Sequence, residues 1–597
     1  MISPDGCKPI MLPGGPLQLV RRYRIPALFC ALCVLVCELA GRPYANMGIC
    51  DDWPYVLMAQ KLAATGHVVY NAWGAPMLTW QLYLAAAFIK LFGFSFTTVR
   101  MSTLLVAAVM AFALQRTLVR AGINEWNATI GTLAFVLSPL YLMLSATFMS
   151  DVQGLFAVVL CLYGCLRALQ SSTSRAAVGW LCFAVASNAV CGTSRQIAWL
   201  GILVMVPSTL WLLRDRRRVL LAGSAVTVAG ALFIFGCLQW LKQQPYSIPE
   251  HLIVRPFSGT QVVVQFIYIC LDSAFLLFVL VVLFVPQVRK CGPRILAVVF
   301  LLLAGYLFMG LYPSHIRGSV FLLPVSGPVG EWVNAPAIFA YPMLKGSPPV
   351  FLHLWVQALL TIATVGGLLG LFVSLRGARR VLAAADSTKV DSTHGTTWKQ
   401  FAVLLGPFMI FNALLLVPRA ATTGAHDRYL LGPLLIALLC LVRYYQDRMQ
   451  QRLPLASILL VGGMALYSIV VVHNMFGLYR ARAAMAAELR ADGVPDTSVD
   501  NGWEYNFGVE LQHADHLNVS TVEVPVHGYV PSPPLPAGTC AMNIFDDTPH
   551  IKPRYGVSFS PNACYGPAPF APMHYSRWPA SEPGTLYVVY YTPPVKR

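Results

Sequence analysis

Long apolar runs, separated by short segments that carry charge or Pro and Gly, dominate the hydrophobic pattern of the chain. A helix needs about 20 apolar residues to cross the hydrocarbon core of a bilayer. Thirteen runs are close to that length, and we predict each of them to be a membrane-spanning helix. They are residues 24–41, 98–119, 127–145, 152–169, 176–192, 196–213, 219–241, 258–285, 295–312, 351–375, 400–417, 429–446 and 454–473.

One further apolar segment, residues 77–91, is short for a span and contains the polar Gln81 and the charged Lys90. Counting it as a span would place the basic cluster Arg214–Arg218 outside the membrane. Basic residues gather on the cytoplasmic side of membrane proteins, so we predict that this segment is an interfacial or re-entrant helix.

This topology divides the chain into three parts. Residues 1–23 form a cytoplasmic N-terminus, and residues 24–473 form a transmembrane domain. Within the transmembrane domain, residues 42–97 form a long outer loop with interfacial helices. Residues 474–597 form the third part, a C-terminal domain outside the membrane.

The C-terminal domain combines helical and strand patterns. A helix is predicted from Tyr479 to Arg490, and a strand at residues 585–591, so we expect a small α+β domain. Cys540 and Cys564 both lie there, and an oxidising compartment would allow them to form a disulfide.

Composition supports the membrane assignment and excludes other classes. The chain is 57% hydrophobic and 11% charged, whereas soluble domains contain about 25% charged residues. The net charge of +17 comes from short basic clusters between apolar runs, a pattern typical of cytoplasmic anchoring rather than nucleic-acid binding. No phosphate-binding P-loop, dinucleotide fingerprint or hydrolase elbow is present. We therefore expect a multi-pass membrane protein, with membrane lipids and no nucleic acid among its partners.

The few acidic residues that hydropathy does not explain fall on the outer side in this topology. Burying a carboxylate near hydrocarbon costs several kcal/mol unless it is paired or used. Asp51 and Asp52 open the outer loop, and Asp151 begins a later span. Each could simply cap a helix or complement its dipole. The alternative is a general base or a metal ligand at the membrane surface.

Cations and a tyrosine fall on the same predicted side. Arg195 separates two apolar runs, and Asp427, Arg428 and Tyr429 begin the twelfth span. These side chains could merely place their charge in the interface or form a weak local ion pair. Alternatively, both arginines bind a phosphate group, because a guanidinium matches phosphate oxygens with paired hydrogen bonds. The same side also receives His315, Arg317 and Glu331.

Taken together, these short motifs resemble the GT-C membrane glycosyltransferases. The resemblance is to the bacterial branch related to protein O-mannosyltransferases, the lipid A aminoarabinose transferase and the RgtA/B/C/D-like transferases. It covers about residues 20–475, and thirteen spans is a count known in the family. The matching motifs are Cys50-Asp51-Asp52 with Tyr55, Ala59 and Thr65-Gly66, then Leu91-Phe92-Gly93-Phe94-Ser95 with Arg100, Met149-Ser150-Asp151, Arg195-Gln196 and Asp427-Arg428-Tyr429.

The resemblance implies an enzyme that transfers a hexosyl or pentosyl group, with inversion, from a polyprenyl-phosphate donor. The acceptor would be a glycan, lipid or protein at the outer face of the membrane. Asp51 would be the base, and Asp52 would be its neighbour and could substitute for it. Asp151 would orient the acceptor or the base, or hold a metal if one is used. Members of this branch work without an obligate metal, so no cofactor is expected.

The same resemblance suggests which residues bind the phosphate group of the donor. Many relatives carry a lysine before the interfacial helix, where this chain reads Trp73-Gly74-Ala75-Pro76. The missing cation would be replaced by Lys90, Arg195 or Arg428, with Asp427 and Tyr429 beside them.

Two other classes stay open at this point. A transporter or flippase of lipid-linked sugars would also be polytopic and basic, although transporters usually show two related halves and polar groups near mid-span. The second alternative is a structural protein of envelope assembly that has lost catalysis. The missing lysine leaves this hypothesis open.

Overall fold

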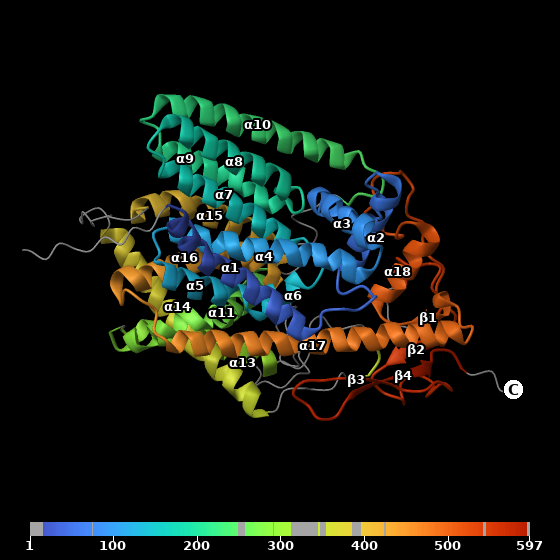
Figure 1. Ribbon diagram of the computed structural model, residues 1–597. Coiled ribbons are helices and arrows are strands. Elements are labelled where there is room, and N and C mark those ends of the chain that lie inside the picture. Colours follow the sequence, from blue (N-terminus) through green and yellow to red (C-terminus); the bar gives the residue numbers. More distant parts are fainter. Residues whose placement is uncertain are drawn as a thin grey trace, which may run out of the picture.

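The computed structural model describes residues 16–74, 76–248, 257–290, 292–311, 344–346, 354–384, 396–422, 426–540 and 545–593. This part of the chain forms a bundle of long helices with a small β-sheet at one end (Figure 1). Among the described residues, ten helices are long and apolar enough to cross a membrane, and an eleventh span results if one bent pair is counted as a unit. The predicted polytopic helical membrane protein with a small C-terminal sheet is confirmed.

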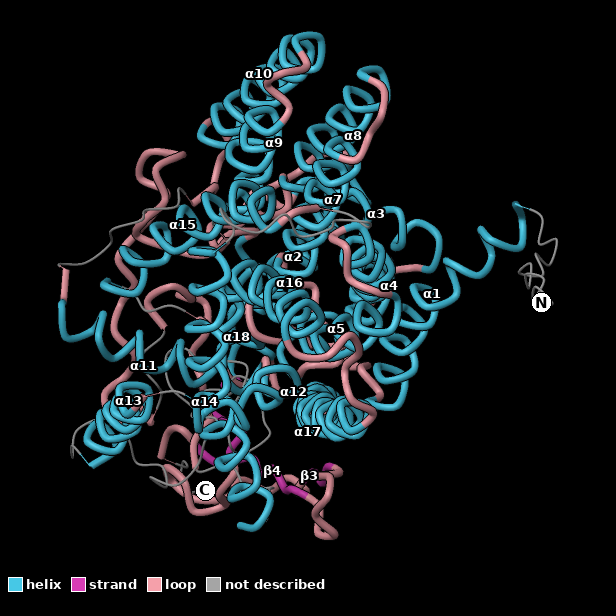
Figure 2. The backbone as a smooth tube through the Cα atoms, turned by 90° about the vertical axis from the view of Figure 1, so that its left-hand side faces the viewer, coloured by secondary structure: helices cyan, strands magenta, loops and turns pink. Residues whose placement is uncertain are grey.

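Most predicted spans coincide with single helices. Figure 2 views many of the helices nearly end-on and shows α16 (Leu431–Arg448) near the middle of the bundle. It also shows α17 (Ala456–Ala491) next to the strands β3 (Met573–Tyr575) and β4 (Gly584–Tyr590). The helices that match predicted spans are α1 (Pro16–Gly41), α4 (Phe96–Arg120), α7 (Asp151–Leu169), α8 (Ser174–Gly192), α10 (Arg217–Lys242), α13 (Pro293–Leu311), α14 (Leu354–Ala384), α15 (Trp398–Thr422), α16 (Leu431–Arg448) and α17 (Ala456–Ala491).

Three predicted spans are interrupted. The span predicted at 127–145 bends by 69° between α5 (Glu125–Val136) and α6 (Pro139–Ser145), where Ser138 caps a helix that starts with proline. The span predicted at 258–285 is divided into α11 (Gly259–Leu276), α12 (Phe278–Val281) and η3 (Val282–Lys290). The third, at 196–213, forms part of the site described below.

The short apolar segment 77–91 is the helix α3 (Thr79–Phe92), which packs against α2 (Asp52–Thr65) and α4. Its 14 residues give a length of about 21 Å, which is too short to cross a hydrocarbon core of about 30 Å. Its length agrees with the prediction that this segment is not a span, and its place at the membrane interface stays a prediction.

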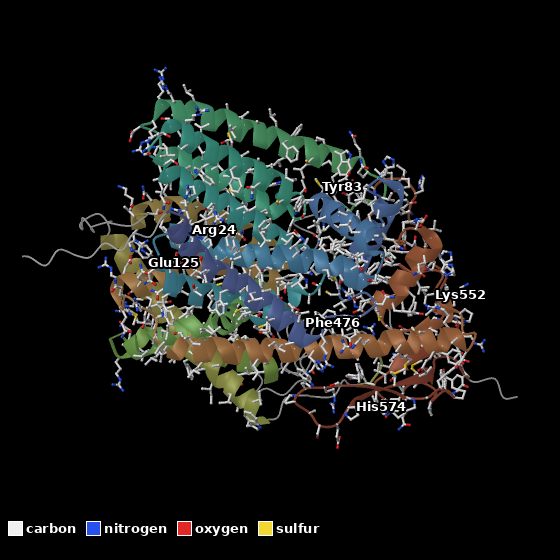
Figure 3. All side chains as sticks on the ribbon, viewed as in Figure 1. Arg24, Tyr83, Glu125, Phe476, Lys552 and His574 are labelled. Carbon is white, nitrogen blue, oxygen red and sulfur yellow. A yellow bond between two sulfur atoms is a disulfide. The ribbon has the colours of Figure 1, made fainter. Side chains whose placement is uncertain are left out.

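The two ends of the bundle differ. Arg24 and Glu125 lie at one end, whereas Lys552 and His574 lie at the other (Figure 3). The helices α2 and α3 lie at the same end as the C-terminal sheet (Figure 1). Which end faces the cytoplasm stays a prediction.

The C-terminal region grows out of the last span without a break. The helix α17 has 36 residues, so the predicted domain boundary after residue 473 falls inside a continuous helix. The sheet has the order β1-β2-β4-β3, with β1 parallel to β2 and the other pairs antiparallel. Cys540 and Cys564 form a disulfide. The further elements are η5 (Asp496–Ser498), β1 (Val499–Asp500), α18 (Trp503–Ala514), β2 (Tyr555–Ser558), β3 (Met573–Tyr575) and β4 (Gly584–Tyr590).

The sheet covers the extension of α17. Leu478, Met485 and Leu489 on the helix share an apolar core with Val557 and Val588 on the strands. This core attaches the C-terminal region firmly to the membrane helix that precedes it.

Candidate active site at the end of the bundle

A cavity of about 730 Å³ lies where the interfacial helices meet the ends of several spans. Its lining contains both polar and apolar side chains. Its polar lining includes Asp51, Tyr55, Trp73, Ser150, Asp151, Arg195, Gln196, Asn412, Arg419, Arg428 and Tyr429, and its apolar lining includes Leu155, Val158, Ile197, Leu200, Leu203, Ile234, Leu238, Phe408, Leu415 and Leu416.

Asp51 faces this cavity. Its side chain is 20% exposed, its Oδ1 accepts a hydrogen bond from the indole Nε1 of Trp73 at 3.0 Å, and its Oδ2 lies 3.4 Å from Nη2 of Arg428. Asp51 directly precedes α2, and Cys50 before it has a left-handed φ of 50°. The chain therefore turns sharply just before the carboxylate and presents it at the start of the helix.

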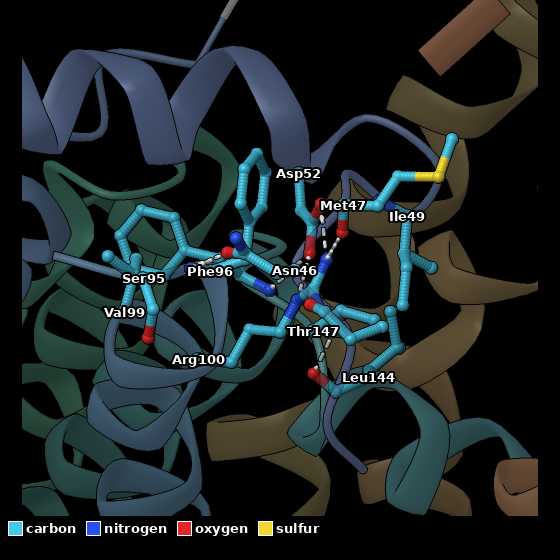
Figure 4. Close-up of polar contacts among 12 residues, drawn as sticks. Asn46, Met47, Ile49, Asp52, Ser95, Phe96, Val99, Arg100, Leu144 and Thr147 are labelled. Carbon is cyan, nitrogen blue, oxygen red and sulfur yellow. Dashed lines mark hydrogen bonds and ion pairs between the residues drawn. The ribbon is translucent and has the colours of Figure 1, made fainter. Parts of the chain in front are cut away.

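Asp52 points elsewhere, into the protein core. Arg100 Nε donates to Oδ2 at 2.7 Å, and the backbone N–H of Ile49 donates to Oδ1 at 2.7 Å (Figure 4). The backbone N–H of Phe148 reaches Oδ2 at 3.3 Å. Arg100 also donates to the carbonyl of Met47 at 2.6 Å. Asp52 thus ties the loop before α2 to α4 and to the segment before α7.

This geometry corrects the prediction that Asp52 could substitute for Asp51 as the base. Asp52 is fully buried, does not line the cavity, and has both oxygens bound to a buried guanidinium and backbone amides. Its carboxylate cannot reach a substrate without losing these contacts. The alternative prediction was that an acid here only stabilises the start of a helix. Asp52, in the first turn of α2, fits that prediction.

Asp151 forms an ion pair in the lining of the same cavity. Its Oδ1 lies 2.8 Å from Nη1 of Arg195, which also donates to the Ser150 hydroxyl at 3.1 Å. Gly154 permits this approach, because a Cβ atom there would lie 3.0 Å from the Cβ of Arg195. The structure therefore brings Asp151 and Arg195 to the same cavity as Asp51.

The segment that follows Arg195 is a helix that changes type along its length. After α8 ends, Arg195 is extended, and η1 (Gln196–Trp199), η2 (Gly201–Met205) and α9 (Val206–Leu212) replace the predicted span at 196–213. The buried Asn188 stabilises this irregular backbone. Its Nδ2 donates to the carbonyls of Ala157 at 3.1 Å and Ala198 at 2.9 Å, and its Oδ1 accepts from the N–H of Ile202 at 3.2 Å.

Irregular backbone at membrane depth needs such partners, because lipid offers none. The signal for it in the sequence was a lone Asn188 inside the apolar run 176–192.

Three guanidinium groups surround the ring of Tyr429. The guanidinium carbons of Arg195, Arg428 and Arg419 lie 5.2, 5.5 and 5.6 Å from the ring centroid. Arg419 also donates to the Tyr429 hydroxyl at 3.3 Å. Cations at these distances are attracted to the face of an aromatic ring. Like charges repel one another, so this cluster is well suited to bind an anion.

Arg419 was missed by the sequence interpretation. It follows Pro418 in the last turn of α15, close to the η4 segment (Asp427–Leu430) that carries Arg428 and Tyr429. The available signal was an arginine at the outer end of a predicted span, where basic residues are scarce.

Two predicted ligands do not reach the cavity. Lys90 is exposed in the last turn of α3 and does not line the cavity, so the structure corrects its prediction as the replacement cation. The buried carboxylate of Asp427 accepts the N–H of Arg428 at 2.7 Å and shapes η4 from outside the lining. His315, Arg317 and Glu331 lie outside the described residues.

Tyr55 and Gly74 complete the polar wall. Burial raises the pKa of the Tyr55 hydroxyl well above its usual value, and the nearby Asp51 carboxylate raises it further. Tyr55 therefore stays protonated at neutral pH. Gly74 lets the backbone pass its ring, since a Cβ atom there would lie 2.5 Å from Cε1 of Tyr55.

The apolar end of the cavity leads to the outer surface of the bundle. Leu203 on η2 and Leu238 on α10 line the cavity and are also 49% and 37% exposed. An amphipathic molecule could therefore enter sideways, between helices, rather than only from the aqueous end.

No metal centre is evident in the described part of the chain, where no three His, Cys, Asp or Glu side chains are grouped to hold an ion. That the protein needs no metal stays a prediction.

Comparisons with known proteins bear on the fold. No protein-family model matches the chain, and no curated protein matches it. The chain is similar to the apo crystal structure of ArnT from Cupriavidus metallidurans, with 15% identity, a TM-score of 0.37, and coverage of 82% of this chain and 84% of that one. It is similar to the Archaeoglobus fulgidus oligosaccharyltransferase, with 14% identity, a TM-score of 0.43, and coverage of 90% and 70%.

A third similar structure is the S. cerevisiae protein O-mannosyltransferase complex Pmt1-Pmt2, with 15% identity, a TM-score of 0.30, and coverage of 37% of this chain and 32% of that one. All these TM-scores are below 0.5, so the function of this chain has to be inferred from its own cavity.

Proposed function

We propose that the protein is a membrane glycosyltransferase that moves a sugar from a polyprenyl-phosphate donor to an acceptor hydroxyl. One observation carries this proposal. A single cavity joins the carboxylate of Asp51, the guanidinium cluster around Tyr429, and an apolar wall that reaches the outer surface of the bundle.

The cavity offers both charged and apolar side chains, which match the charged and apolar parts of such a donor. A polyprenyl-phosphate sugar has an anionic phosphate between a polar sugar and a long apolar chain. The cluster of Arg195, Arg419 and Arg428 suits the phosphate. The wall with Leu203 and Leu238 suits the first prenyl units, with about 0.8 kcal/mol gained for each buried CH₂ group.

The reaction is a single displacement that inverts the anomeric carbon. The acceptor oxygen forms a bond to that carbon while the bond between the carbon and the phosphate oxygen breaks. The acceptor proton passes to Asp51, and the electron pair of the broken bond leaves with polyprenyl phosphate. The leaving phosphate gains negative charge, which the three guanidinium groups stabilise.

The ion pairs of the cavity support these roles. Arg428 lies 3.4 Å from Asp51 and favours the charged carboxylate that a base requires. Asp151 holds Arg195 at 2.8 Å and orients its fork towards the cavity. We place this reaction at the outer face of the inner membrane, with the N-terminus in the cytoplasm, because the basic segments between spans favour that orientation. A compartment reporter fused after Gly122 is expected in the cytoplasm.

A release assay tests the function. The purified protein is incubated with labelled hexosyl and pentosyl polyprenyl phosphates and candidate acceptors, and free polyprenyl phosphate is measured, with and without EDTA. We expect release that depends on the acceptor, is lost in Asp51→Asn, and persists in EDTA. Absence of release with every donor, together with movement of labelled lipid across vesicles, would favour a flippase instead. Absence of both would favour a non-catalytic role.

A further inference from the structure

The C-terminal region contacts the side chain that holds Asp51. Trp73 donates its indole N–H to Asp51 Oδ1 at 3.0 Å. The ring of Trp73 packs against Trp503 at 5.7 Å and Phe507 at 5.1 Å, measured between ring centroids, and both residues lie on α18. Aromatic pairs at such separations attract each other beyond the effect of buried area. One side chain thus connects α18 to the proposed base.

A fourth ring closes this aromatic cluster. Trp53 on α2 is fully buried and lies 5.6 Å from Trp73 and 5.5 Å from Phe507. The cluster of Trp53, Trp73, Trp503 and Phe507 therefore holds the Trp73 ring from two sides, by α2 and by α18.

The backbone next to Trp73 is held as well. Ala72 is buried and has a left-handed φ of 65°, which is uncommon for a residue with a Cβ atom. Its N–H donates to the carbonyl of Tyr246 at 2.8 Å, and the N–H of Leu517 donates to the carbonyl of Asn71 at 3.1 Å. Such a conformation persists only where surrounding contacts enforce it, and Leu517 belongs to the C-terminal region.

The position of α18 itself is fixed by α17. Arg482 of α17 and Glu504 of α18 are both fully buried and form an ion pair at 2.9 Å. The hydroxyl of Tyr479 donates to the other carboxylate oxygen of Glu504, and Arg482 also donates to the carbonyl of Asn501. The continuous helix from the last span therefore sets where α18 meets Trp73.

We propose that α18 positions the Asp51 carboxylate for catalysis by clamping Trp73, whose N–H orients that carboxylate. The C-terminal region would then be part of the active site rather than only its cover. This inference rests on the proposed function, in which Asp51 is the base. Trp73, Trp503 and Phe507 are positioning residues, because they act through Asp51.

Variants separate the hydrogen bond from the packing. Trp73→Phe keeps a ring in the cluster and removes the N–H donor. Trp503→Ala removes the clamp, and Trp503→Phe restores a ring. The matched control is Trp578→Ala, because Trp578 is also in the C-terminal region but stacks on His473 of α17, with ring centroids 3.7 Å apart. Each variant is assayed as the full-length protein for kcat, KM and the pH dependence of kcat/KM.

A hydrogen bond to a carboxylate favours its charged form, so losing it raises the pH at which the base becomes active. We expect Trp73→Phe to lower kcat about tenfold and to move the acid limb of the kcat/KM profile up by about one pH unit, with the donor KM unchanged. Trp503→Ala should do the same, while Trp503→Phe and Trp578→Ala should keep the original profile. The double variant Trp73→Phe/Trp503→Ala should be no worse than Trp73→Phe.

Unchanged pH profiles in Trp73→Phe and Trp503→Ala, with Asp51→Asn inactive, would overturn the positioning role alone. Additive losses in the double variant would do the same. An active Asp51→Asn would overturn the proposed function and this inference together. If Trp503→Ala does not fold, Trp73→Phe still decides, because it preserves the ring packing.

Discussion

Asp51 and Asp52 are neighbours in the sequence but belong to two different regions of the molecule. The Asp51 side chain is 20% exposed at the cavity and faces Arg428 across 3.4 Å. The Asp52 side chain is fully buried and binds Arg100 at 2.7 Å. Successive side chains at a helix start point about 100° apart, so adjacency does not give two acids a common role.

The comparison also shows how one acid supports the other. The ion pair of Asp52 with Arg100 and the amide of Ile49 fix the first turn of α2. That turn presents Asp51 to the cavity. The buried acid secures the fold locally, and the partly exposed acid faces the cavity.

The largest effect is expected from Asp51→Asn. The amide cannot accept a proton, so kcat should fall by about 10² to 10⁴-fold, the usual contribution of a general base. The thermal unfolding temperature in detergent should stay within about 2 °C of the wild type, since the Asn side chain has the same size and its oxygen can still accept the Trp73 N–H. A large drop in unfolding temperature would show that Asp51 is a structural acid like Asp52.

Asp52→Asn should show the opposite behaviour. Removing one partner of a buried ion pair costs about 3–5 kcal/mol in the free energy of unfolding, because Arg100 keeps an uncompensated charge. We expect a lower unfolding temperature and a lower yield, with the folded fraction still active. The double variant Asp52→Asn/Arg100→Met serves as the control and should recover part of the stability. A stable but inactive Asp52→Asn would reverse the two assignments.

Arg419→Lys tests the cluster of three arginines around Tyr429. This cluster lies at the cavity, on the side of Asp51, and has no counterpart around the buried Asp52. Lysine keeps the charge but loses the planar fork that binds phosphate oxygens in pairs. The donor KM should rise about tenfold with a smaller change in kcat, corresponding to about 1.4 kcal/mol of lost donor binding. Arg443→Lys is a suitable comparison, because Arg443 pairs with Asp447 at 2.7 Å outside the cavity lining. Equal effects of both substitutions would argue against a phosphate site.

The smallest effect is expected from Lys90→Ala. Lys90 is exposed and lies outside the cavity lining, so kcat and the donor KM should stay within about twofold of the wild type. A loss as large as that of Arg419→Lys would restore Lys90 as the replacement cation.

Much of the fold follows from local properties of the sequence. Apolar length and basic boundaries predicted the spans, and the shortness of residues 77–91 identified α3. The changes of helix type in the span predicted at 196–213 were not predicted. Asn188 was the signal in the sequence, but its bonds to neighbouring backbone depend on how the helices pack. A hydropathy pattern shows where a helix is apolar but not which side chain completes its hydrogen bonds.

In the candidate site, too, some residues could be identified from the sequence and others could not. Scarce charges at span ends identified Asp51, Asp151, Arg195 and Arg428, since each is costly in that environment. Arg419 was missed because a single arginine at a span end has an ordinary explanation in the sequence. Its contact with Tyr429, from a different helix, is what assigns it to the cluster.

The sequence by itself determined that this is a polytopic membrane protein and that Asp51, Asp151, Arg195 and Arg428 fall on one predicted side, because apolar length and charge placement are local properties. Only the tertiary structure decided that Asp51, and not Asp52, faces the cavity. It also decided that Trp503 packs against Trp73, which is hydrogen-bonded to Asp51. Those relations depend on side-chain direction and on packing between segments far apart in the chain, which a linear pattern does not encode.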